Sequence, residues 1–309
     1  MKRICTLFIL LLCLGTAFSQ SKWQPTQKEL EGPLFFLSSP LLEGRETGKR
    51  GILIAAEYIA SVMIQHGLLP AGDTHPDGIG WFQDFENDSL FVRNVLGMIK
   101  GVDTTKYVVL SAHYDHLGIR EDGVYAGADD NASGISGMLA LANLWNNKKE
   151  RPPYNLIFAA WSGEEKDMLG SKYFVQHFTF GKEAFLLNMN FDMISRSDPK
   201  DSTCNILEIG VLKGRNDYKE FAERHNRSSG THFDLDFWET DGNGGSDYIS
   251  FSAHGIPVMA FFAGLHSEYH SPADTRDKID WAKMIRVLTL ANSCLEDFLH
   301  LVNTIDSLE

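Results

Sequence analysis

Short apolar runs alternate with helical segments along most of this chain, and that alternation does most to limit the folds open to it. Six runs of five to seven residues predict strands, at residues 94–99, 107–111, 155–160, 185–191, 205–211 and 257–262. Segments with helical periodicity predict helices at residues 51–67, 134–145, 169–177 and 281–302. Strands separated by helices favour an α/β fold, with a mostly parallel central sheet and helices on both of its faces.

The composition and the lack of linkers indicate one domain. Hydrophobic residues make up 43% of the chain and charged residues 22%, which is typical of a folded protein and too apolar for disorder. After residue 19, no repeat, low-complexity tract or long Pro/Gly/Ser linker divides the sequence. We therefore expect a single domain over residues 20–309.

Residues 1–19 have the pattern of a secretory signal peptide. Lys2 and Arg3 precede an apolar stretch at residues 4–14, and small residues follow it. Cleavage before Gln20 would make the mature protein secreted or periplasmic. A buried N-terminal helix and a lipoprotein signal are the alternatives for this segment.

Charge and hydropathy argue against two classes of partner. Lys and Arg total 28 against 41 Asp and Glu, a formal net charge of −13, which disfavours nucleic acid and anionic membrane surfaces. No apolar run reaches the roughly 20 residues of a membrane-spanning helix. Of the four cysteines, Cys204 and Cys294 lie outside the predicted signal peptide, and the sequence leaves open whether they form a disulfide.

Candidate metal-binding side chains stand where predicted strands end or just before a predicted helix. In chain order they are His113, Asp115, Asp130, Glu164, Glu165, Asp192 and His270. Ligands of open α/β sheets bind just beyond the carboxyl ends of the strands. We therefore expect these imidazoles and carboxylates to converge at one edge of the sheet.

Two imidazoles with several carboxylates suit zinc, and two ions can share such a set. One carboxylate would then bridge the metals, and a water between them would become a nucleophile near neutral pH. In the pair Glu164–Glu165, one carboxylate can bind metal while the other accepts the proton of that water. Asp115, two residues beyond His113, can accept the other imidazole N–H.

Each of these motifs also has an ordinary structural interpretation. His113-x-Asp115 is typical of a surface turn, Asp130 before a helix is typical of a cap, and Glu164–Glu165 of a solvated helix start. Their joint occurrence at the strand ends of one sheet is what favours a site. His116 and His266 are expected to line it without binding metal. The chain lacks the H-E-x-x-H, G-x-S-x-G and G-x-x-x-x-G-K-[ST] patterns, which disfavours thermolysin-type, serine-hydrolase and nucleotide-triphosphatase functions.

In this order the motifs resemble those of the double-zinc aminopeptidase family, the secreted bacterial leucine-type exopeptidases and their relatives. The resemblance runs from residues 41–45 (LLEGR) through Asp274 to residues 277–280 (DKID), nearly the whole mature chain. Five ordered motifs are specific together, although each is weak alone. The chain has Asp167 and Met168 where the family usually has Gly and Leu, and neither position is a ligand.

The resemblance implies two zinc ions and assigns their ligands. His113, Asp130 and Asp192 would bind one ion. Asp130, Glu165 and His270 would bind the other, so that Asp130 bridges the pair. The resemblance also implies the zinc exopeptidase fold.

The resemblance also implies catalytic roles. Glu164 would be the general base, Tyr269 would steady the oxyanion, and Asp115 would support His113. A cis peptide between Asp130 and Asn131 is implied as well. The expected activity is hydrolysis of N-terminal residues from peptides with a free N-terminus, by a metal-bridged water.

Two other functions remain open at this point. A glutaminyl-peptide cyclotransferase resembles this fold and uses one zinc, although residues 131–134 (NASG) after Asp130 favour the peptidase pattern. A non-catalytic binding protein on the same fold is the second alternative. The side-chain preference, the choice between aminopeptidase, dipeptidase and carboxypeptidase, and the oligomeric state are not indicated by the sequence.

Overall fold

The structure is a computed structural model of the chain, and it describes residues 23–306, with side chains to residue 302. The predicted signal peptide, residues 1–19, lies outside the described residues. Within residues 23–306, every helix is too short or too polar to cross a bilayer.

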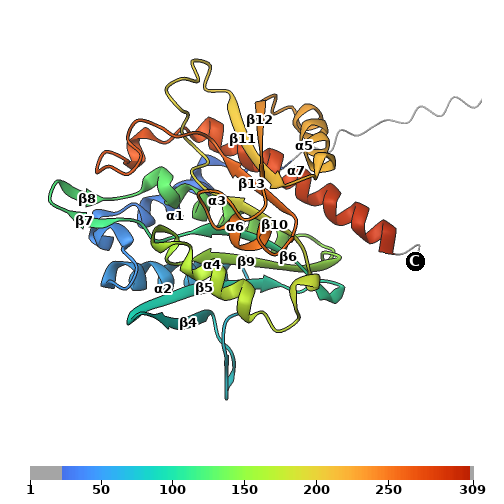
Figure 1. The fold of residues 1–309 in the computed structure, drawn as a ribbon, viewed down its shortest axis with the longest axis horizontal. Coiled ribbons are helices and arrows are strands. Elements are labelled where there is room, and N and C mark those ends of the chain that lie inside the picture. Colours follow the sequence, from blue (N-terminus) through green and yellow to red (C-terminus); the bar gives the residue numbers. More distant parts are fainter. Residues whose placement is uncertain (1–22, 307–309) are drawn as a thin grey trace, which may run out of the picture.

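A nine-stranded sheet runs through the molecule (Figure 1). Its strand order is β1-β5-β9-β6-β10-β13-β11-β12, and β4 pairs with β5. The strands are β1 (Leu69–Pro70), β4 (Phe82–Asn87), β5 (Leu90–Ile99), β6 (Asp103–His113), β9 (Tyr154–Trp161), β10 (Phe185–Phe191), β11 (Ile206–Leu212), β12 (Asp234–Thr240) and β13 (Val258–Phe262). Two small two-stranded sheets are formed by β2 (Thr74–His75) with β3 (Gly78–Ile79) and by β7 (Gly118–Arg120) with β8 (Gly123–Tyr125).

The four central strands β9, β6, β10 and β13 are parallel, so their carboxyl ends share one edge of the sheet. Antiparallel pairs flank them: β5 with β9, β4 with β5, and β11 with β13. The β4–β5 hairpin turns through Asp88 and Ser89, both with positive φ, which is the geometry of a two-residue type I′ turn. The predicted α/β fold with a mostly parallel centre is confirmed.

Helices cover both faces of the sheet (Figure 1). They are α1 (Gln27–Leu37), α2 (Arg50–Gln65), α3 (Gly134–Asn146), α4 (Leu169–His177), α5 (Asn216–Ser229), α6 (Tyr248–Ser252) and α7 (Trp281–Asp306). Alternate side chains of β6 show that the sheet is buried on both of its faces. Val108 and Leu110 belong to the core beneath α1, α2, α3, α5 and α7, whereas Tyr107 and Val109 belong to the core beneath α4 and α6. This burial on both faces explains why β9 and β13 are almost continuous apolar runs.

The six predicted strands all form, and so do the four predicted helices, within a few residues at each end. Several short elements and four longer ones, α1, α5, β4 and β12, were not predicted from the sequence. Helix α1 begins with a capping box of Thr26 and Glu29, but Pro33 interrupts its pattern. Helix α5 is mostly polar, and β4 and β12 are partly exposed strands near the sheet margins. Cys204 and Cys294 are both free thiols, so the disulfide that the sequence left open does not form.

Candidate metal centre

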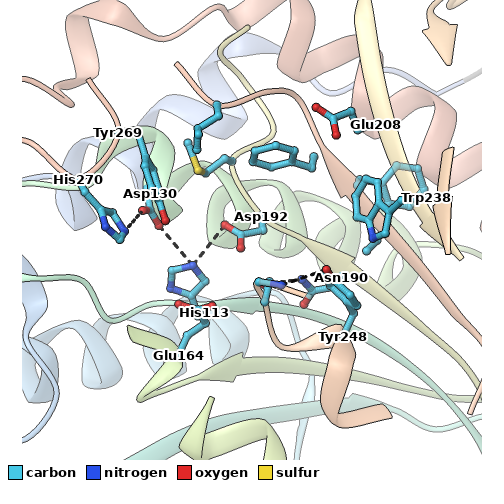
Figure 2. Close-up of a pocket in the computed structure, with 17 residues that line it drawn as sticks. His113, Asp130, Glu164, Asn190, Asp192, Glu208, Trp238, Tyr248, Tyr269 and His270 are labelled. Carbon is cyan, nitrogen blue, oxygen red and sulfur yellow. Dashed lines mark hydrogen bonds and ion pairs between the residues drawn. The ribbon is translucent and has the colours of Figure 1, made fainter. Parts of the chain in front are cut away.

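The predicted site residues meet at the carboxyl edge of the central strands, and Figure 2 shows His113, Asp130, Glu164, Asp192 and His270 among them. His113 is the last residue of β6, and Asp192 directly follows β10. Glu164 and Glu165 lie in a short helical turn after β9, and His270 lies in the loop after β13. These side chains therefore lie at the sheet edge that the order of the strands predicted. Asp130 joins them from the turn that leads into α3.

One group consists of His113, Asp130 and Asp192. His113 Nε2 lies 3.3 Å from Asp130 Oδ1 and 3.2 Å from Asp192 Oδ1. One ligand atom from each residue lies within 4.8 Å of the others, and His113 and Asp130 are buried. An imidazole nitrogen and two carboxylate oxygens at this spacing can bind one metal ion.

A second group forms around the other oxygen of Asp130. His270 Nε2 lies 3.3 Å from Asp130 Oδ2 and 3.4 Å from Glu165 Oε2. His116 Nδ1 is also present, 2.9 Å from Glu165 Oε1 and 3.7 Å from Asp130 Oδ2. His116, predicted to line the site, therefore also stands in a group with Asp130 and Glu165 that could hold a metal ion.

The two carboxylate oxygens of Asp130 thus face two different groups of ligands. This arrangement is the one a bridging carboxylate needs in a two-metal site. The donor set also fits zinc, because imidazole nitrogens and carboxylate oxygens are its usual non-thiolate ligands. The residues present are consistent with two metal ions.

Hydrogen bonds to the Asp274 carboxylate hold the turn that carries Asp130 in place. The buried Asp274 carboxylate accepts hydrogen bonds from the backbone N–H of Asp129 at 3.1 Å and of Asp130 at 3.0 Å. The peptide bond between Asp130 and Asn131 is cis, as the resemblance implied. The sequence showed Asp274 only as part of a motif, because its backbone partners lie 145 and 144 positions away.

Side chains on either side of Asp130 tie the same turn to the end of β10. Asn131 donates its amide N–H to the Phe191 carbonyl at 2.9 Å. The Asp129 carboxylate accepts the backbone N–H groups of Ser195 at 3.0 Å and Arg196 at 2.9 Å. The Asp129 side chain therefore binds another segment and does not cap α3. His266, expected to line the site, lies behind this turn, 3.7 Å from Asp129 Oδ2.

Asp115 supports more of the site than the sequence predicted. Its fully buried carboxylate accepts the backbone N–H of Glu164 at 3.1 Å and of Glu165 at 3.3 Å, and the Thr47 hydroxyl at 2.9 Å. Its Oδ1 lies 3.7 Å from His113 Nδ1, while the Asp115 backbone oxygen lies closer, at 3.2 Å. Asp115 therefore fixes the Glu164–Glu165 pair relative to the end of β6.

Burial and neighbouring charges shift the pKa values of the pair in opposite directions. Burial raises the pKa of Glu164 well above its ordinary value, and the carboxylates of Asp192 and Asp247 add to the effect. Burial also acts on Glu165, but hydrogen bonds from His116 and His270 outweigh it and lower its pKa to about 2. Glu165 is thus favoured as an anionic ligand and Glu164 as a group that exchanges a proton.

A buried cation lies beneath the acidic groups. Arg45 donates to the carbonyl oxygens of Tyr114 at 2.8 Å, Ala126 at 2.7 Å and Gly127 at 3.0 Å. Burial lowers its pKa to about 10, and the charge of Asp130 opposes that shift. Arg45 is a structural element that joins the segment before α2 to the turn of Asp130.

A cavity of about 300 Å³ opens beside the candidate ligands (Figure 2). His113, Glu164 and Asp192 line it on the metal side. Its other walls are mostly apolar and include Met193, Trp238, Tyr248, Phe262 and Leu265, together with the carboxylate of Glu208. Tyr269 stacks on His270 with ring centroids 3.8 Å apart and is 38% exposed. The cavity can admit the end of a substrate next to Glu164.

Sequence comparison identifies the family. The profile of Peptidase family M28 matches residues 94–294, more than half of the chain, and the chain therefore belongs to this family. Aminopeptidase YwaD of Bacillus subtilis is 28% identical over 196 residues, which are 60% of this chain and 40% of YwaD. The chain spans about two fifths of the length of the first curated relatives it matches.

Solved structures show the same fold. BSAP, a zinc aminopeptidase from Bacillus subtilis, superimposes with a TM-score of 0.70 at 16% identity, over 87% of this chain and 94% of that chain. A glutaminyl cyclase from Porphyromonas gingivalis superimposes with a TM-score of 0.64 at 16% identity, over 88% of this chain and 97% of the cyclase. The fold is therefore shared by proteins described as peptidases and as a cyclase, so the site must decide between the two chemistries.

Proposed function

We propose that this protein is a di-zinc metallopeptidase that removes N-terminal residues from peptides. The observation that carries the proposal is the carboxylate of Asp130, whose two oxygens face two separate groups of ligands. Membership of Peptidase family M28 supports it. The cyclase is the weaker alternative, because one zinc ion does not require a bridging carboxylate.

His113, Asp130 and Asp192 would hold one zinc ion, and Asp130, Glu165 and His270 the other. His116 is a further donor at the second position. The chemistry that bound zinc supplies here is Lewis acidity, which lowers the pKa of a water molecule to about 7 and polarises a peptide carbonyl.

Glu164 is the proposed general base. Its side chain lines the cavity, and Asp115 holds its backbone N–H at 3.1 Å. Burial raises the pKa of this carboxyl, which makes its carboxylate a stronger base toward the proton of a water molecule. Glu164 would take the proton of the attacking water on its carboxylate and then deliver it to the leaving amine.

Two further interactions orient the substrate. The Tyr269 hydroxyl would donate a hydrogen bond to the developing oxyanion, and burial raises its pKa, so the phenol keeps its proton. The carboxylates of Asp192 and Glu164 in the cavity favour the free α-ammonium group of a peptide N-terminus. This charge preference is the reason to expect removal from the N-terminus.

Glu164→Gln tests the mechanism. The amide has nearly the same shape but cannot accept the proton, so kcat should fall by about 10²- to 10⁴-fold while both metal ions remain bound. Mass spectrometry measures the metal content of the variant, and kinetics with a single peptide measure its kcat. The two measurements together separate loss of the base from loss of metal. Retention of full activity by this variant would refute the assignment of Glu164.

A peptide panel tests the reaction itself. Wild-type protein with zinc is incubated with free and acetylated peptides, C-terminally amidated peptides and one peptide that begins with Gln. The proposal expects stepwise loss of N-terminal residues that acetylation blocks. Loss of ammonia from the Gln peptide alone would identify a cyclase instead.

The site of action is proposed from the first residues of the chain. The signal-peptide pattern at residues 1–19 supports a secreted or periplasmic enzyme. N-terminal sequencing of the mature protein from its native cells would show whether it starts at Gln20.

A further inference from the structure

Glu208 occupies an unusual position for a carboxylate. It lies on β11 between Leu207 and Ile209, which point into the core beneath α5 and α7. Strand alternation therefore turns Glu208 to the opposite face of the sheet, where the cavity lies. It pairs with Phe262 of β13 on one side and with Asp236 of β12 on the other.

The cavity connects Glu208 with the candidate metal centre. His113, Glu164 and Asp192 line one part of the cavity, and Glu208 lines another. Figure 2 shows the Glu208 carboxylate directed inward, on the side away from His270. A substrate side chain that enters the cavity from the metal centre would approach this carboxylate.

The walls between the two ends are apolar and aromatic. Phe262, Met193 and Trp238 lie among them. A Cβ atom on Gly210 would lie 2.5 Å from Cε2 of Trp238, so the indole packs directly against the backbone of β11, two residues from Glu208. Such walls suit an aliphatic stem, and an indole face also attracts a cation.

Glu208 has no counter-charge of its own. Within the described residues it forms no ion pair or hydrogen bond. Burial raises its pKa, and Asp236 and Asp198 raise it further. Among the described residues, Lys283 is the cation that lowers this pKa, and its Nζ is occupied by Ser197 Oγ and the Ala263 carbonyl, to which it donates at 2.7 Å each.

We propose that Glu208 selects substrates whose N-terminal residue is Lys or Arg. The apolar walls would hold the stem of such a side chain, and its cationic end would pair with the Glu208 carboxylate. A Leu or Met side chain would cover that half-buried carboxylate without giving it a partner, which is unfavourable. The inference rests on the proposed aminopeptidase function and specifies the substrate class of the same site.

The test compares tripeptides that begin with Lys or with norleucine, whose side chain has the same four-carbon stem without the ammonium group. Wild-type zinc-loaded protein should have the higher kcat/KM for Lys-Ala-Ala. Glu208→Gln should lower the ratio of Lys to norleucine kcat/KM by about 10- to 100-fold, as expected for loss of a desolvated charge pair. Turnover of the norleucine peptide should stay the same or increase.

Asp236→Asn is the matched control. Asp236 is the register neighbour of Glu208 but is exposed and does not line the cavity. Asp236→Asn removes one charge, as Glu208→Gln does, but it should change the ratio of Lys to norleucine kcat/KM by no more than about twofold from wild type. The reason is that solvent screens an exposed charge. An equal effect of both variants would overturn the inference. It would indicate that the overall negative charge of the region, and not contact with Glu208, determines the preference for Lys.

A binding measurement separates this inference from the proposed reaction. Calorimetry with L-lysine amide and L-norleucine amide reports the selectivity of the cavity without turnover. Tighter binding of the lysine compound, lost in Glu208→Gln, would support the inference even if no peptide were cleaved. Preference of wild-type protein for norleucine in both assays would overturn it while leaving the aminopeptidase intact. If Glu208→Gln does not fold, Glu208→Met provides the same comparison.

Discussion

Asp274 supports the turn that presents Asp130, and Asp274→Ala removes that support. The substitution deprives two buried backbone N–H groups, those of Asp129 and Asp130, of their acceptors at 3.1 and 3.0 Å. A buried donor without a partner costs about 1–3 kcal/mol, so the two together predict a loss of about 2–6 kcal/mol in the free energy of unfolding.

An opposing effect has to be separated from this loss. Burial and the charge of Asp274 raise the pKa of Asp129 to about 7, so removal of the charge relieves some repulsion. Asp274→Asn removes the same charge but keeps one acceptor oxygen for the backbone. We expect it to lose no more than about 2 kcal/mol, and the difference between the two variants measures the acceptor itself.

The assay is urea denaturation of the metal-free proteins, followed by zinc titration and peptide kinetics. Because Asp130 is shared by both groups of ligands, Asp274→Ala should weaken zinc binding by about 10- to 100-fold. Asp277→Ala, at an exposed position three residues on, is the control and should change stability by less than about 1 kcal/mol. Wild-type stability and zinc affinity in Asp274→Ala would refute the supporting role of this carboxylate.

Two further predictions concern pH and metal. Asp247 is fully buried, and burial raises its pKa to about 7 although the Ser171 hydroxyl opposes the shift. Because the folded state holds this proton more tightly, the stabilisation is present below pH ~4 and is lost as pH rises toward ~7, by at most about 4 kcal/mol. Denaturation of the metal-free protein should show this decline, and Asp247→Asn should reduce it; an unchanged pH profile would contradict the pKa shift. Zinc at 100 times its Kd should stabilise the protein by about 2.7 kcal/mol, and a chelator should reverse the corresponding rise in Tm of about 4 °C. A Tm insensitive to both additions would argue against a metal centre.

Much of the fold was predictable because the central strands are buried on both faces. Apart from Asn155, the runs at residues 155–160 and 257–262 are apolar without alternation, which is the pattern that burial on both faces produces. Elements with a weaker pattern were missed for an equally physical reason. Helix α5 buries only Tyr218, Phe221, Ala222 and Asn226, so its sequence looks polar.

The candidate ligands were also accessible from sequence, because parallel strands bring their carboxyl ends to one edge. His113 and Asp192 needed only strand order to be placed near each other. The contact of His116 with Glu165 was not predicted, because it depends on how the loop after β6 folds back, and a sequence motif does not show that.

The sequence by itself determined the α/β order, the sheet edge at which the ligands gather and the kinds of donor atoms found there. These properties follow from local periodicity and from residue type, and both can be read directly from the amino-acid sequence. Only the tertiary structure decided that Asp274 holds the turn of Asp130, that Asp115 holds Glu164, and that Glu208 faces the cavity. Such contacts join residues far apart in the chain, and burial, which sets their strength, exists only once the chain has folded.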